Sequence, residues 1–401
     1  MNGSTQPPGE DPLRLAVVGV SGSRICGVRD HAALLSEALP NHGVIPSWHW
    51  LSREASSARG ARAELAAWAS ALPAQLEQQR AQAVLLHYSV FSYSYRGFPV
   101  FVRPVLRELR GSGLPVVTVL HEFVYPWRRG GVRGKGWALS QSAALRRVMR
   151  SSAAVVVTAP FRAQWLAAQR WLARRPARLA PVFSNLPAPA PGADTRAGDR
   201  AVVGLFGYGY EGAAVAIALE AMRMLGDGGP SPRLRLLGSP GAGSPAAERW
   251  LAGARERGID GDLSFSGVLP AQELADELAA CDVLLHLEPS GPTSRKGTLA
   301  ASLASGTAVV AIDGPRRWPE LTAAGAALVV EPTPNGLADG IAALLADEQR
   351  RRQLGARGSA FASSAMGVER SALVVTELFE ELVGVAPRAW RSGGQPVAGR
   401  G

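Results

Sequence analysis

PVFSNLPAPAPGADTRAGDRAVVGLF, residues 181 to 206, contains a change of character that divides the chain in two. Its first part, Pro181 to Arg200, is rich in Pro and Gly and has no hydrophobic period, which is typical of a linker. Its last part, Val202 to Phe206, is an apolar run of the kind that forms a buried strand. We therefore expect a second folded unit to start here, with the domain boundary near residue 190.

Short apolar runs alternate with Ala/Leu-rich stretches of helical period on both sides of this linker, which indicates α/β units with parallel sheets. We expect four buried strands in the first half: Leu15–Val20, Ala83–His87, Val116–Leu120 and Ala153–Thr158. Helical runs fall at Asp30–Leu39, Ala61–Gln79, Pro99–Arg110 and Ser140–Arg150. The second half continues with strands at Val202–Phe206, Leu234–Leu237, Leu263–Phe265, Val283–Leu287, Ala308–Ile312 and Ala327–Val330, then a helical run at Leu337–Phe361. The pattern predicts two Rossmann-like, doubly wound domains in succession.

Four segments follow from this reading. The first domain covers residues 13–190 and the second covers residues 200–367. An amphipathic helix at 368–384 and a Gly/Pro/Arg-rich, disordered tail at 386–401 complete the chain. No internal repeat has a fixed period.

Composition excludes several classes of protein. The 401 residues are 47% hydrophobic and 19% charged, and no apolar run approaches the ~20 residues that cross a bilayer, which indicates a soluble globular chain. Cys26 and Cys281 fall in different domains, so they support neither a disulfide framework nor a metal cluster. The start of the chain lacks the pattern of a signal peptide, so we expect a cytoplasmic protein. A net charge of +10 favours anionic ligands.

The first domain offers candidate residues where its strands end. Gly27 lies in a glycine-containing stretch before a helix, where the backbone can approach an anion, although an ordinary turn capped by Asp30 is an equal alternative. His121 follows a strand directly and could contact a sugar hydroxyl, a phosphate or a reacting group, as a catalytic residue would, although a lone histidine more often has a structural role. Residues 87–98 are dense in aromatic side chains, which either stack on a ligand or fold over their own core. Residues 128–136 read as a mobile basic loop.

The second domain has its strongest candidate in residues 288–299, EPSGPTSRKGTL, between a strand and an Ala-rich helix. Arg295 and Lys296 place two cations at the start of that helix, where its dipole also favours an anion. Gly297 permits a close approach, and Thr293 or Ser294 could cap the helix. The chain has lysine at only two positions, Lys135 and Lys296, so a lysine here is notable. We interpret the segment, with Thr298, as a cradle for a diphosphate.

Taken in order, these pieces resemble the GT4 family of retaining glycosyltransferases, which have the GT-B fold. The matching pieces span about residues 13–384. They are Cys26-Gly27-Val28-Arg29-Asp30 before a helix, Thr118–Glu122 with its His121-Glu122, Asn185-Leu186-Pro187, Leu237-Gly238, Phe265–Leu269 with Glu273-Leu274, Cys281-Asp282-Val283, and Ala304–Val310. The resemblance implies two Rossmann-like domains that face a central cleft.

The resemblance also implies an activity, namely hexosyl transfer from a nucleotide-diphosphate sugar to an acceptor with retention of configuration. The acceptor would be an envelope glycan or lipid, or a small-molecule metabolite. Gly27 would lie near the diphosphate and His121 near the transferred sugar, while the nucleotide, with its base beside Val268 and Leu269, would also lie near Gly238. No cofactor is implied, and no metal ion is expected because no Asp-x-Asp motif stands at a strand end.

Two departures from the family pattern concern the phosphate partners. Residues 207–212, GYGYEG, lack the Arg and Lys that many members have after the first strand of the second domain. The two usual glutamate positions are Thr293 and Ala301 here. The chain therefore resembles a sub-branch with an S-x-R-R-G-S-type turn, in which Arg295 and Lys296 replace the missing partners and Glu288 is a spare candidate.

Other functions stay open at this point. The chain could be another sugar enzyme of the same fold, an epimerase or a phosphorylase, although Lys296 lies in the wrong setting for a pyridoxal phosphate lysine. It could also be a non-catalytic nucleotide- or nucleic-acid-binding protein, but its basic residues are spread over both domains. We therefore expect a nucleotide-sugar donor and an acceptor as partners, no nucleic acid, and a possible peripheral contact with the inner face of the membrane.

Overall fold

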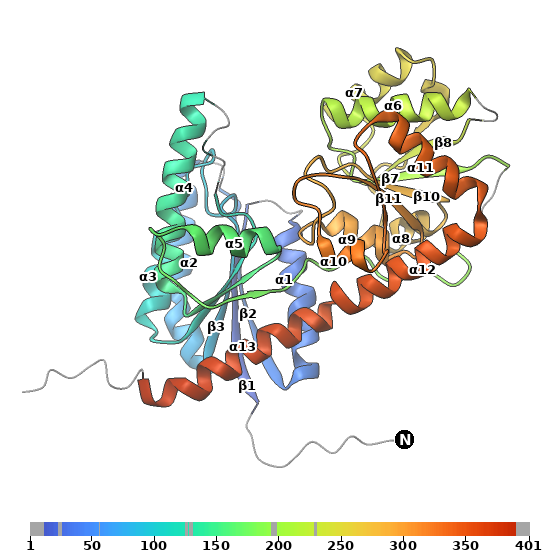
Figure 1. Cartoon of the computed structure of the whole chain (residues 1–401). Coiled ribbons are helices and arrows are strands. Elements are labelled where there is room, and N and C mark those ends of the chain that lie inside the picture. Colours follow the sequence, from blue (N-terminus) through green and yellow to red (C-terminus); the bar gives the residue numbers. More distant parts are fainter. Residues whose placement is uncertain are drawn as a thin grey trace, which may run out of the picture. The chain divides into compact units, whose positions relative to one another are not determined.

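The computed structural model describes residues 12–22, 26–55, 57–124, 127, 131–193, 199–227 and 231–389. The chain folds into two compact units, which Figure 1 shows in the colours of the sequence. Unit 1 contains Met1–Ala180 and Val368–Gly401, and unit 2 contains Pro181–Gly367. The tail that the sequence predicts at 386–401 lies outside the described residues from residue 390 onward.

Unit 1 is built on a parallel sheet of six strands in the order β2-β1-β3-β4-β5-β6. Its strands are β1 (Leu13–Ser21), β2 (Val44–Ser52), β3 (Ala83–Tyr88), β4 (Val116–Leu120), β5 (Ala154–Val157) and β6 (Ala177–Leu179). Its helices are α1 (Gly27–Ala38), the short 3-10 helix η1 (Leu39–His42), α2 (Ala58–Gln78), α3 (Val102–Gly111), α4 (Gly131–Ser151), α5 (Pro160–Ala168) and α13 (Val368–Ala389). The four strands that the sequence predicts are present, and β2 and β6 are additional.

The strand order of unit 1 reverses between β1 and β3. From β1 the chain moves outward to β2 and then returns to β3 on the other side of β1. Ligands of open α/β sheets bind beyond the carboxyl ends of the strands at such a reversal. The loops that follow β1 and β3 are therefore the place to look for a site in this unit.

The last helix, α13, belongs to unit 1 although it follows unit 2 in sequence. It packs against α1 and η1 and also touches β6. Glu369 accepts hydrogen bonds from Asn41 at 2.9 Å and bonds with His42 at 2.8 Å, and Arg178 of β6 pairs with Glu381 at 2.9 Å. Its apolar face, including Leu378 and Phe379, is buried, so burial rather than these exposed ion pairs holds it in place.

Unit 2 repeats the architecture with a second parallel sheet of six strands, in the order β12-β11-β10-β7-β8-β9. Its strands are β7 (Val202–Phe206), β8 (Arg233–Leu237), β9 (Leu263–Phe265), β10 (Val283–His286), β11 (Ala308–Ile312) and β12 (Leu328–Val330). Its helices are α6 (Ala213–Gly226), α7 (Pro245–Arg255), the 3-10 helix η2 (Asp260–Asp262), α8 (Ala271–Ala279), α9 (Gly297–Ala304), α10 (Pro319–Ala323), α11 (Pro334–Ala346) and α12 (Glu348–Ala365). The strand order reverses between β7 and β10, so the candidate site of this unit lies beyond their carboxyl ends.

The boundary between the two units lies earlier in the chain than the expected position near residue 190, because unit 2 begins at Pro181. The Val182 amide donates to the Ser294 carbonyl at 2.8 Å, and Ala190 donates to the Asp276 side chain at 2.7 Å. These bonds fasten residues 181–190 to unit 2, so the Pro-rich sequence is an ordered strap rather than a free linker.

Two other expectations need correction. Residues 131–136 form the first turns of α4 rather than a mobile loop, and residues 128–130 lie outside the described residues. The helical run at Leu337–Phe361 is two helices, because Asp347 ends α11 and its carboxylate accepts the Arg350 amide at 2.8 Å to begin α12. The Gly and Arg residues at the start of α4 are more typical of a loop than of a helix, which explains the first difference. The second could be seen in the sequence, because Asp347 is a common N-cap residue.

Candidate functional site

The site of unit 2 is formed by the loop that joins β10 to α9, at the reversal of its sheet. The loop starts after His286 and ends at Lys296, the N-cap of α9. Its sharp bend at Gly291 has a φ of +84° and lies against the backbone of Gly314 at the end of β11. This close backbone contact fixes the course of the loop, so Arg295 and Lys296 are carried to the first turn of α9 by a rigid support.

Lys296 forms an ion pair with Glu288 across this loop. Its Nζ lies 2.5 Å from a Glu288 carboxylate oxygen, and Ser290 donates a hydrogen bond to the same carboxylate at 3.1 Å. Burial acts to raise the Glu288 pKa, but the hydrogen bond and charge of Lys296, with the charge of Arg295, outweigh it and hold the pKa below its usual value. Glu288 is therefore ionised at neutral pH and orients the lysine beside the helix start.

The first turn of α9 begins at Gly297, directly after the N-cap residue Lys296, whose own side chain forms no cap hydrogen bond. The N-cap position is therefore two or three residues later than the expected cap at Thr293 or Ser294. Both of these side chains are buried, with 1% and 0% exposed, because they face the core. The Thr293 hydroxyl forms no hydrogen bond with the described residues. The helix dipole and two nearby cations together favour an anion at this turn.

The glycine-rich loop after β7 lies against the same turn. Gly207 has a φ of +71°, and a Cβ there would come within 2.9 Å of the Thr298 methyl group. Only glycine fits such a contact without strain. The loop also brings the half-buried Tyr210 beside Glu288, and its hydroxyl bonds with the Leu287 backbone; burial and then the Glu288 charge raise its pKa. Sequence reasoning missed Tyr210, although its place in the loop after β7 is a signal for it.

His286 is a second residue that sequence reasoning did not select. It ends β10 and is 2% exposed, and its Nε2 has no hydrogen-bond partner among the described residues. Burial, followed by the charge of Lys296, lowers its pKa to about 4, while Glu288 acts in the opposite direction. The imidazole is therefore neutral behind the cationic turn.

The residues expected near the base lie after β8 and β9. Gly238 has a φ of +77° and donates its amide to the Ser266 hydroxyl at 3.0 Å, which joins the two loops. Val268 is 70% exposed, so it is open to a ligand. Leu269 is half-buried and packs into the core around Leu274, so less of its side chain is available. Gly297 is half-buried in the first turn of α9, against Val182.

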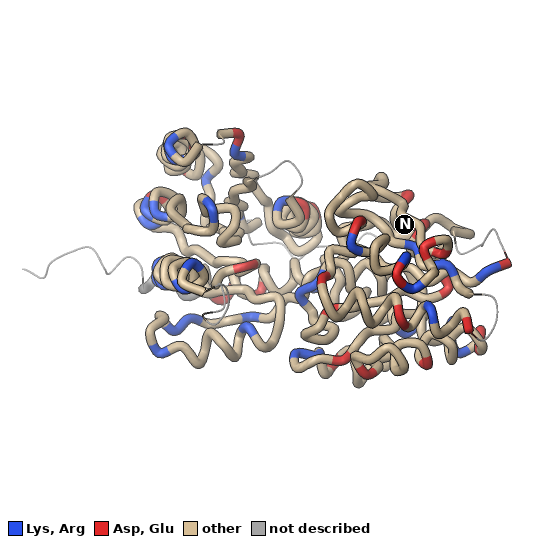
Figure 2. The backbone as a smooth tube through the Cα atoms, turned by 90° about the horizontal axis from the view of Figure 1, so that it is seen from above, with Lys and Arg blue, Asp and Glu red and all other residues tan. Residues whose placement is uncertain are grey.

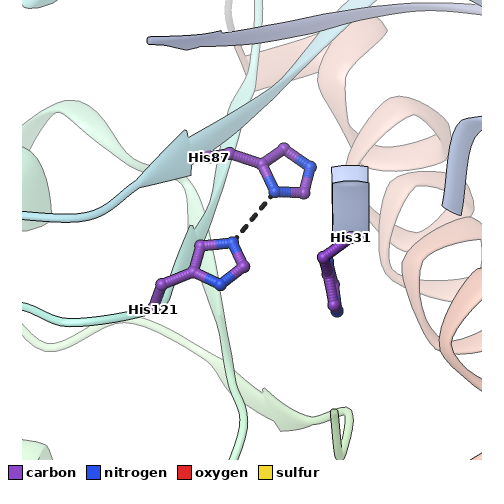
Figure 3. Close-up of side chains that lie close together, drawn as sticks. All are labelled: His31, His87 and His121. Atoms are coloured by element: carbon purple, nitrogen blue, oxygen red, sulfur yellow. Dashed lines mark hydrogen bonds between the residues drawn. The ribbon is translucent and has the colours of Figure 1, made fainter. Parts of the chain in front are cut away.

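Unit 1 places three histidines together at the reversal of its own sheet, as Figure 3 shows. His31 comes from α1, His87 lies in β3 and His121 follows β4 directly. All three are buried, with 8%, 1% and 9% exposed. His87 and His121 share a hydrogen bond of 3.0 Å, and His31 meets the His121 ring edge-on with centroids 5.1 Å apart. The sequence singles out His121 alone, because only the order β1-β3-β4 shows that the other two join it.

The three imidazoles are neutral at physiological pH. Burial lowers the His31 pKa to about 4, and burial together with the neighbouring histidines holds the pKa values of His87 and His121 well below the usual value of a histidine. The Arg162 charge also disfavours a proton on His121, while Arg162 pairs with Glu122 at 2.8 Å and donates to the His121 carbonyl. Neutral rings can each accept and donate one hydrogen bond, as recognition of hydroxyl groups requires.

The same group is a set of three side chains that could hold a metal ion. One nitrogen of each ring lies within 4.8 Å of the others. A tetrahedral zinc site has Zn–N bonds of about 2.0–2.1 Å, which brings its nitrogens to about 3.3 Å from one another. Of the described residues, no carboxylate or thiol completes the group. In the arrangement that the structure has, the histidines form a hydrogen-bonding group.

Gly27 begins α1 close to this edge of the sheet. It is exposed, and a Cβ there would meet nothing within 4 Å, so the space in front of the helix start is open. Cys26 is the N-cap, and Asp30 lies inside the first turn, which corrects the expectation that Asp30 caps the helix. Residues 23–25, which precede it, lie outside the described residues.

The aromatic stretch is divided between the core and the surface of unit 1. Tyr88 and Tyr93 are fully buried and stack with centroids 5.4 Å apart, so they belong to the core. Phe91 and Phe98 are 64% and 37% exposed and lie at the surface of unit 1. The outer part of the stretch is therefore available to a ligand.

The charge of the chain is divided unequally between the units. Residues 1–180 carry 23 Lys and Arg against 9 Asp and Glu, while residues 181–367 carry 16 against 20. Basic residues occur in both domains, as the sequence predicts, but they outnumber the acidic residues only in residues 1–180. Figure 2 shows the basic residues of unit 1 on its helices and loops. The net positive charge resides in unit 1, whereas residues 181–367 of unit 2, which carry the cationic turn, have a small excess of acidic residues.

Comparisons with known proteins agree with this arrangement. Residues 200–347 match the family model described as Glycosyl transferases group 1. No curated protein matches the sequence. A solved sucrose-phosphate synthase from Thermosynechococcus elongatus is 20% identical, with a TM-score of 0.66 over 93% of this chain and 99% of that one. Anabaena HepE, solved with UDP and glucose, is 15% identical, with a TM-score of 0.63 over 92% and 100%. A Rickettsia africae glycosyltransferase is 10% identical, with a TM-score of 0.69 over 94% and 100%.

At these identities the solved structures establish the fold. The two doubly wound sheets are those of the GT-B fold, so this part of the sequence prediction is confirmed. The family match lies inside unit 2 and includes the turn with Arg295 and Lys296. Among the described residues, no helix is long and apolar enough to cross a membrane.

Proposed function

We propose that the chain is a glycosyltransferase that moves a hexosyl group from a nucleoside-diphosphate sugar to an acceptor hydroxyl, with retention. The observation that carries this proposal is the start of α9, which holds Arg295 and Lys296 at the sheet reversal within the region that the family model matches. The donor diphosphate binds there, with Gly297 and Thr298 in the first turn. The neighbours' names add support, since HepE was solved with UDP and glucose.

In this reaction the bond between the sugar C1 and the diphosphate oxygen breaks, and a bond from C1 to the acceptor oxygen forms. The acceptor proton passes to the leaving diphosphate, so the nucleoside diphosphate departs and no further reactant is needed. Negative charge grows on the diphosphate as C1 departs, and cations that are already in place stabilise it without reorganisation. Because two side chains supply this charge, we propose that transfer needs no metal ion and persists in a chelator.

Unit 1 binds the acceptor in this proposal. Gly27 and the neutral group of His31, His87 and His121 supply hydrogen bonds for hydroxyl groups of the sugar or the acceptor. We place the enzyme in the cytoplasm and propose that unit 1 makes the peripheral contact with the inner face of the membrane. Both parts of the proposal rest on the resemblance and the geometry of each unit taken separately.

The alternative functions are less well supported. An epimerase or a phosphorylase could share the fold, but residues 200–347 match a model of glycosyl transferases. A phosphorylase lysine must reach pyridoxal phosphate, whereas Lys296 is engaged by Glu288 at 2.5 Å. A nucleic-acid-binding protein would use the basic unit 1, and salt-dependent binding of an oligonucleotide tests it.

The test is a thermal-shift screen of nucleoside diphosphates and their sugars. A ligand at 100 times its Kd stabilises the protein by about 2.7 kcal/mol, which raises the melting temperature measurably. We expect at least one nucleoside diphosphate to stabilise the chain and the matching sugar to be hydrolysed or transferred. Stabilisation by none of them at millimolar concentration would refute the proposal.

A further inference from the structure

Unit 1 contains a cavity of about 560 Å³ that the proposed transfer reaction does not yet use. Its lining comes from the first turns of α2, the loop after β3, and the start of α4. These segments follow the carboxyl ends of β2, β3 and β4, so the cavity opens at the edge of the sheet where α/β proteins bind ligands. Its volume falls within the range of ligand sites, about 300–1,000 Å³.

The lining combines positive charge with aromatic surface. Four arginines line it, Arg59, Arg62, Arg96 and Arg133, and no described acidic residue lines it. None of the four forms an ion pair with a described residue. An unbalanced group of guanidinium ions within one cavity favours a bound anion, and Arg suits phosphate because it donates two parallel hydrogen bonds.

The remaining lining is mainly aromatic or aliphatic. Tyr95, Phe98 and Phe101 line the cavity, with Val100 at its exposed side. The Arg96 guanidinium lies 5.4 Å from the Tyr95 ring centroid, and the Arg53 guanidinium lies 5.0 Å from that of Phe101. Exposed apolar side chains such as Phe98 and Val100 can contact the uncharged part of a ligand. An inorganic anion alone would leave this surface in water.

The loop that presents Arg96 is held in an unfavourable backbone conformation. Tyr95 and Phe98 exchange backbone hydrogen bonds of 2.9 and 3.0 Å, which closes a two-residue turn. Arg96 has a φ of +49° and Gly97 a φ of +88°, as in the type of turn that favours Asn or Gly at the first of these positions. An arginine there costs about 1–2 kcal/mol of backbone strain, so the side chain is kept despite its effect on stability.

Two side chains of α4 fix this turn in place. Trp137 donates its indole N–H to the Arg96 carbonyl at 2.9 Å, and Gln141 donates to the Gly97 carbonyl at 2.9 Å. A Cβ on Gly97 would come within 2.6 Å of the Trp137 ring, so the glycine allows the close approach. Because the turn is anchored to a helix, the backbone of Arg96 is held in place before any ligand arrives, and the Arg133 guanidinium lies 4.8 Å from the centroid of the Trp137 ring in the same helix.

From this cavity we propose that unit 1 binds an anionic amphiphile, a phosphate-bearing molecule whose uncharged part is apolar, and that this molecule is the acceptor or its anchoring portion. The phosphate contacts Arg59, Arg62, Arg96 and Arg133, and the apolar part lies against Phe98 and Val100. The excess of basic residues in residues 1–180 attracts such a ligand to this unit. The assignment as acceptor rests on the proposed transferase function, whereas the binding site stands without it.

The probe is octyl phosphate, kept below its micelle concentration at pH 7.5 and titrated calorimetrically into the full chain. Inorganic phosphate supplies the charge alone, and octyl β-glucoside supplies the apolar chain alone. We expect octyl phosphate to bind at least tenfold more tightly than either. Equal binding of octyl phosphate and inorganic phosphate, or of octyl phosphate and octyl glucoside, would overturn the proposal.

Variants locate the binding. We expect Arg96→Gln and Arg62→Gln each to weaken octyl phosphate binding about tenfold. Arg103→Gln removes an exposed arginine of α3 that does not line the cavity, and it should leave the affinity unchanged. Phe98→Ala should weaken octyl phosphate but not inorganic phosphate. Octyl phosphate affinity in Arg96→Gln equal to that in Arg103→Gln would contradict the site, and circular dichroism establishes that each variant is folded.

Two further arms separate the sources of the ligand and the two proposals. The first arm measures binding of the chain to vesicles of phosphatidylcholine with phosphatidylglycerol. Vesicle binding that octyl phosphate competes away would identify a lipid surface as the source of the ligand, whereas absence of vesicle binding would identify a free ligand. Both results support an anionic amphiphile as the class of ligand. Nucleoside diphosphate binding should be unchanged in all four variants. If the wild type binds no nucleoside diphosphate, the transferase proposal fails, while the octyl phosphate result still decides the cavity.

Discussion

Replacement of Lys296 by alanine should cost more than the loss of one phosphate contact. The lysine lies 2.5 Å from Glu288, whose side chain is 14% exposed, so Lys296→Ala leaves that carboxylate unpaired beside the diphosphate. Loss of one charge-assisted contact to a developing anion, roughly 2–4 kcal/mol, lowers turnover about 30- to 1,000-fold, and we expect Arg295→Ala to fall in this range. Lys296→Ala should lower turnover further, because it also leaves the Glu288 carboxylate unpaired.

Part of the loss of diphosphate affinity in Lys296→Ala comes from the unpaired Glu288 carboxylate, and a second substitution that removes this charge should restore that part. A carboxylate about 5 Å from a phosphate oxygen repels it by about 3 kcal/mol at an effective dielectric constant of 20. The double variant Lys296→Ala/Glu288→Gln removes this repulsion, so we expect it to bind the nucleoside diphosphate about 100-fold more tightly than Lys296→Ala. Without Lys296, burial raises the Glu288 pKa, so the affinity of the single variant should also improve as the pH falls from 7 to 5.5.

Calorimetric titration of the nucleoside diphosphate into both variants measures these effects. Arg223→Ala provides the matched control, because it removes an ion pair with Glu220 on α6 in the same unit. The double variant binding no better than Lys296→Ala, together with a flat pH profile, would refute the reasoning. It would mean that Glu288 does not face the bound phosphate.

Three other outcomes follow from the structure. Below pH 6.5 the unfolded chain binds protons at its histidines while buried His31 stays neutral to about pH 4, so His31 should lower the free energy of unfolding by up to about 3 kcal/mol as the pH falls. Thermal melts of His31→Gln between pH 7 and pH 4.5 should show a smaller loss of stability than those of the wild type, and an equal loss would contradict the neutral, buried state of His31. His121→Ala should bind the bare nucleoside diphosphate normally, since it belongs to unit 1, and a large loss in calorimetry would place it at the wrong ligand. Gly97→Ala should destabilise the chain by about 1–2 kcal/mol and weaken octyl phosphate binding, because its φ is +88° and Trp137 leaves no room for a Cβ; a denaturation midpoint equal to that of the wild type would argue against the anchored turn.

The strands that are buried on both faces could be predicted from sequence. β3, β4 and β5 are continuous apolar runs, as central strands of a parallel sheet must be. β2 was missed because it is an edge strand whose exposed face carries Trp48 and whose other positions include Trp50 and His49, so it has no apolar run. Its stabilising contacts, such as the stacked Trp48 and Trp50 rings 5.0 Å apart, come from side chains that also occur in loops.

The candidate sites could be predicted only in part, for a related reason. Arg295 and Lys296 lie within one loop, so their proximity to a helix start is visible in a local pattern. The ion pair with Glu288 and the contact of Gly207 with Thr298 depend on how loops from different strands meet. The cavity around Arg96 joins segments that are far apart in sequence, so local patterns do not reveal it.

The central claim is that a nucleoside diphosphate binds at the start of α9. Calorimetric titration of the nucleoside diphosphate selected by the thermal-shift screen, into the wild type and Arg295→Ala, tests it most directly. The account predicts one site in the wild type and an affinity at least tenfold lower in the variant, with both proteins equally folded. Equal affinities in the two proteins would contradict it, because the diphosphate would then be bound elsewhere.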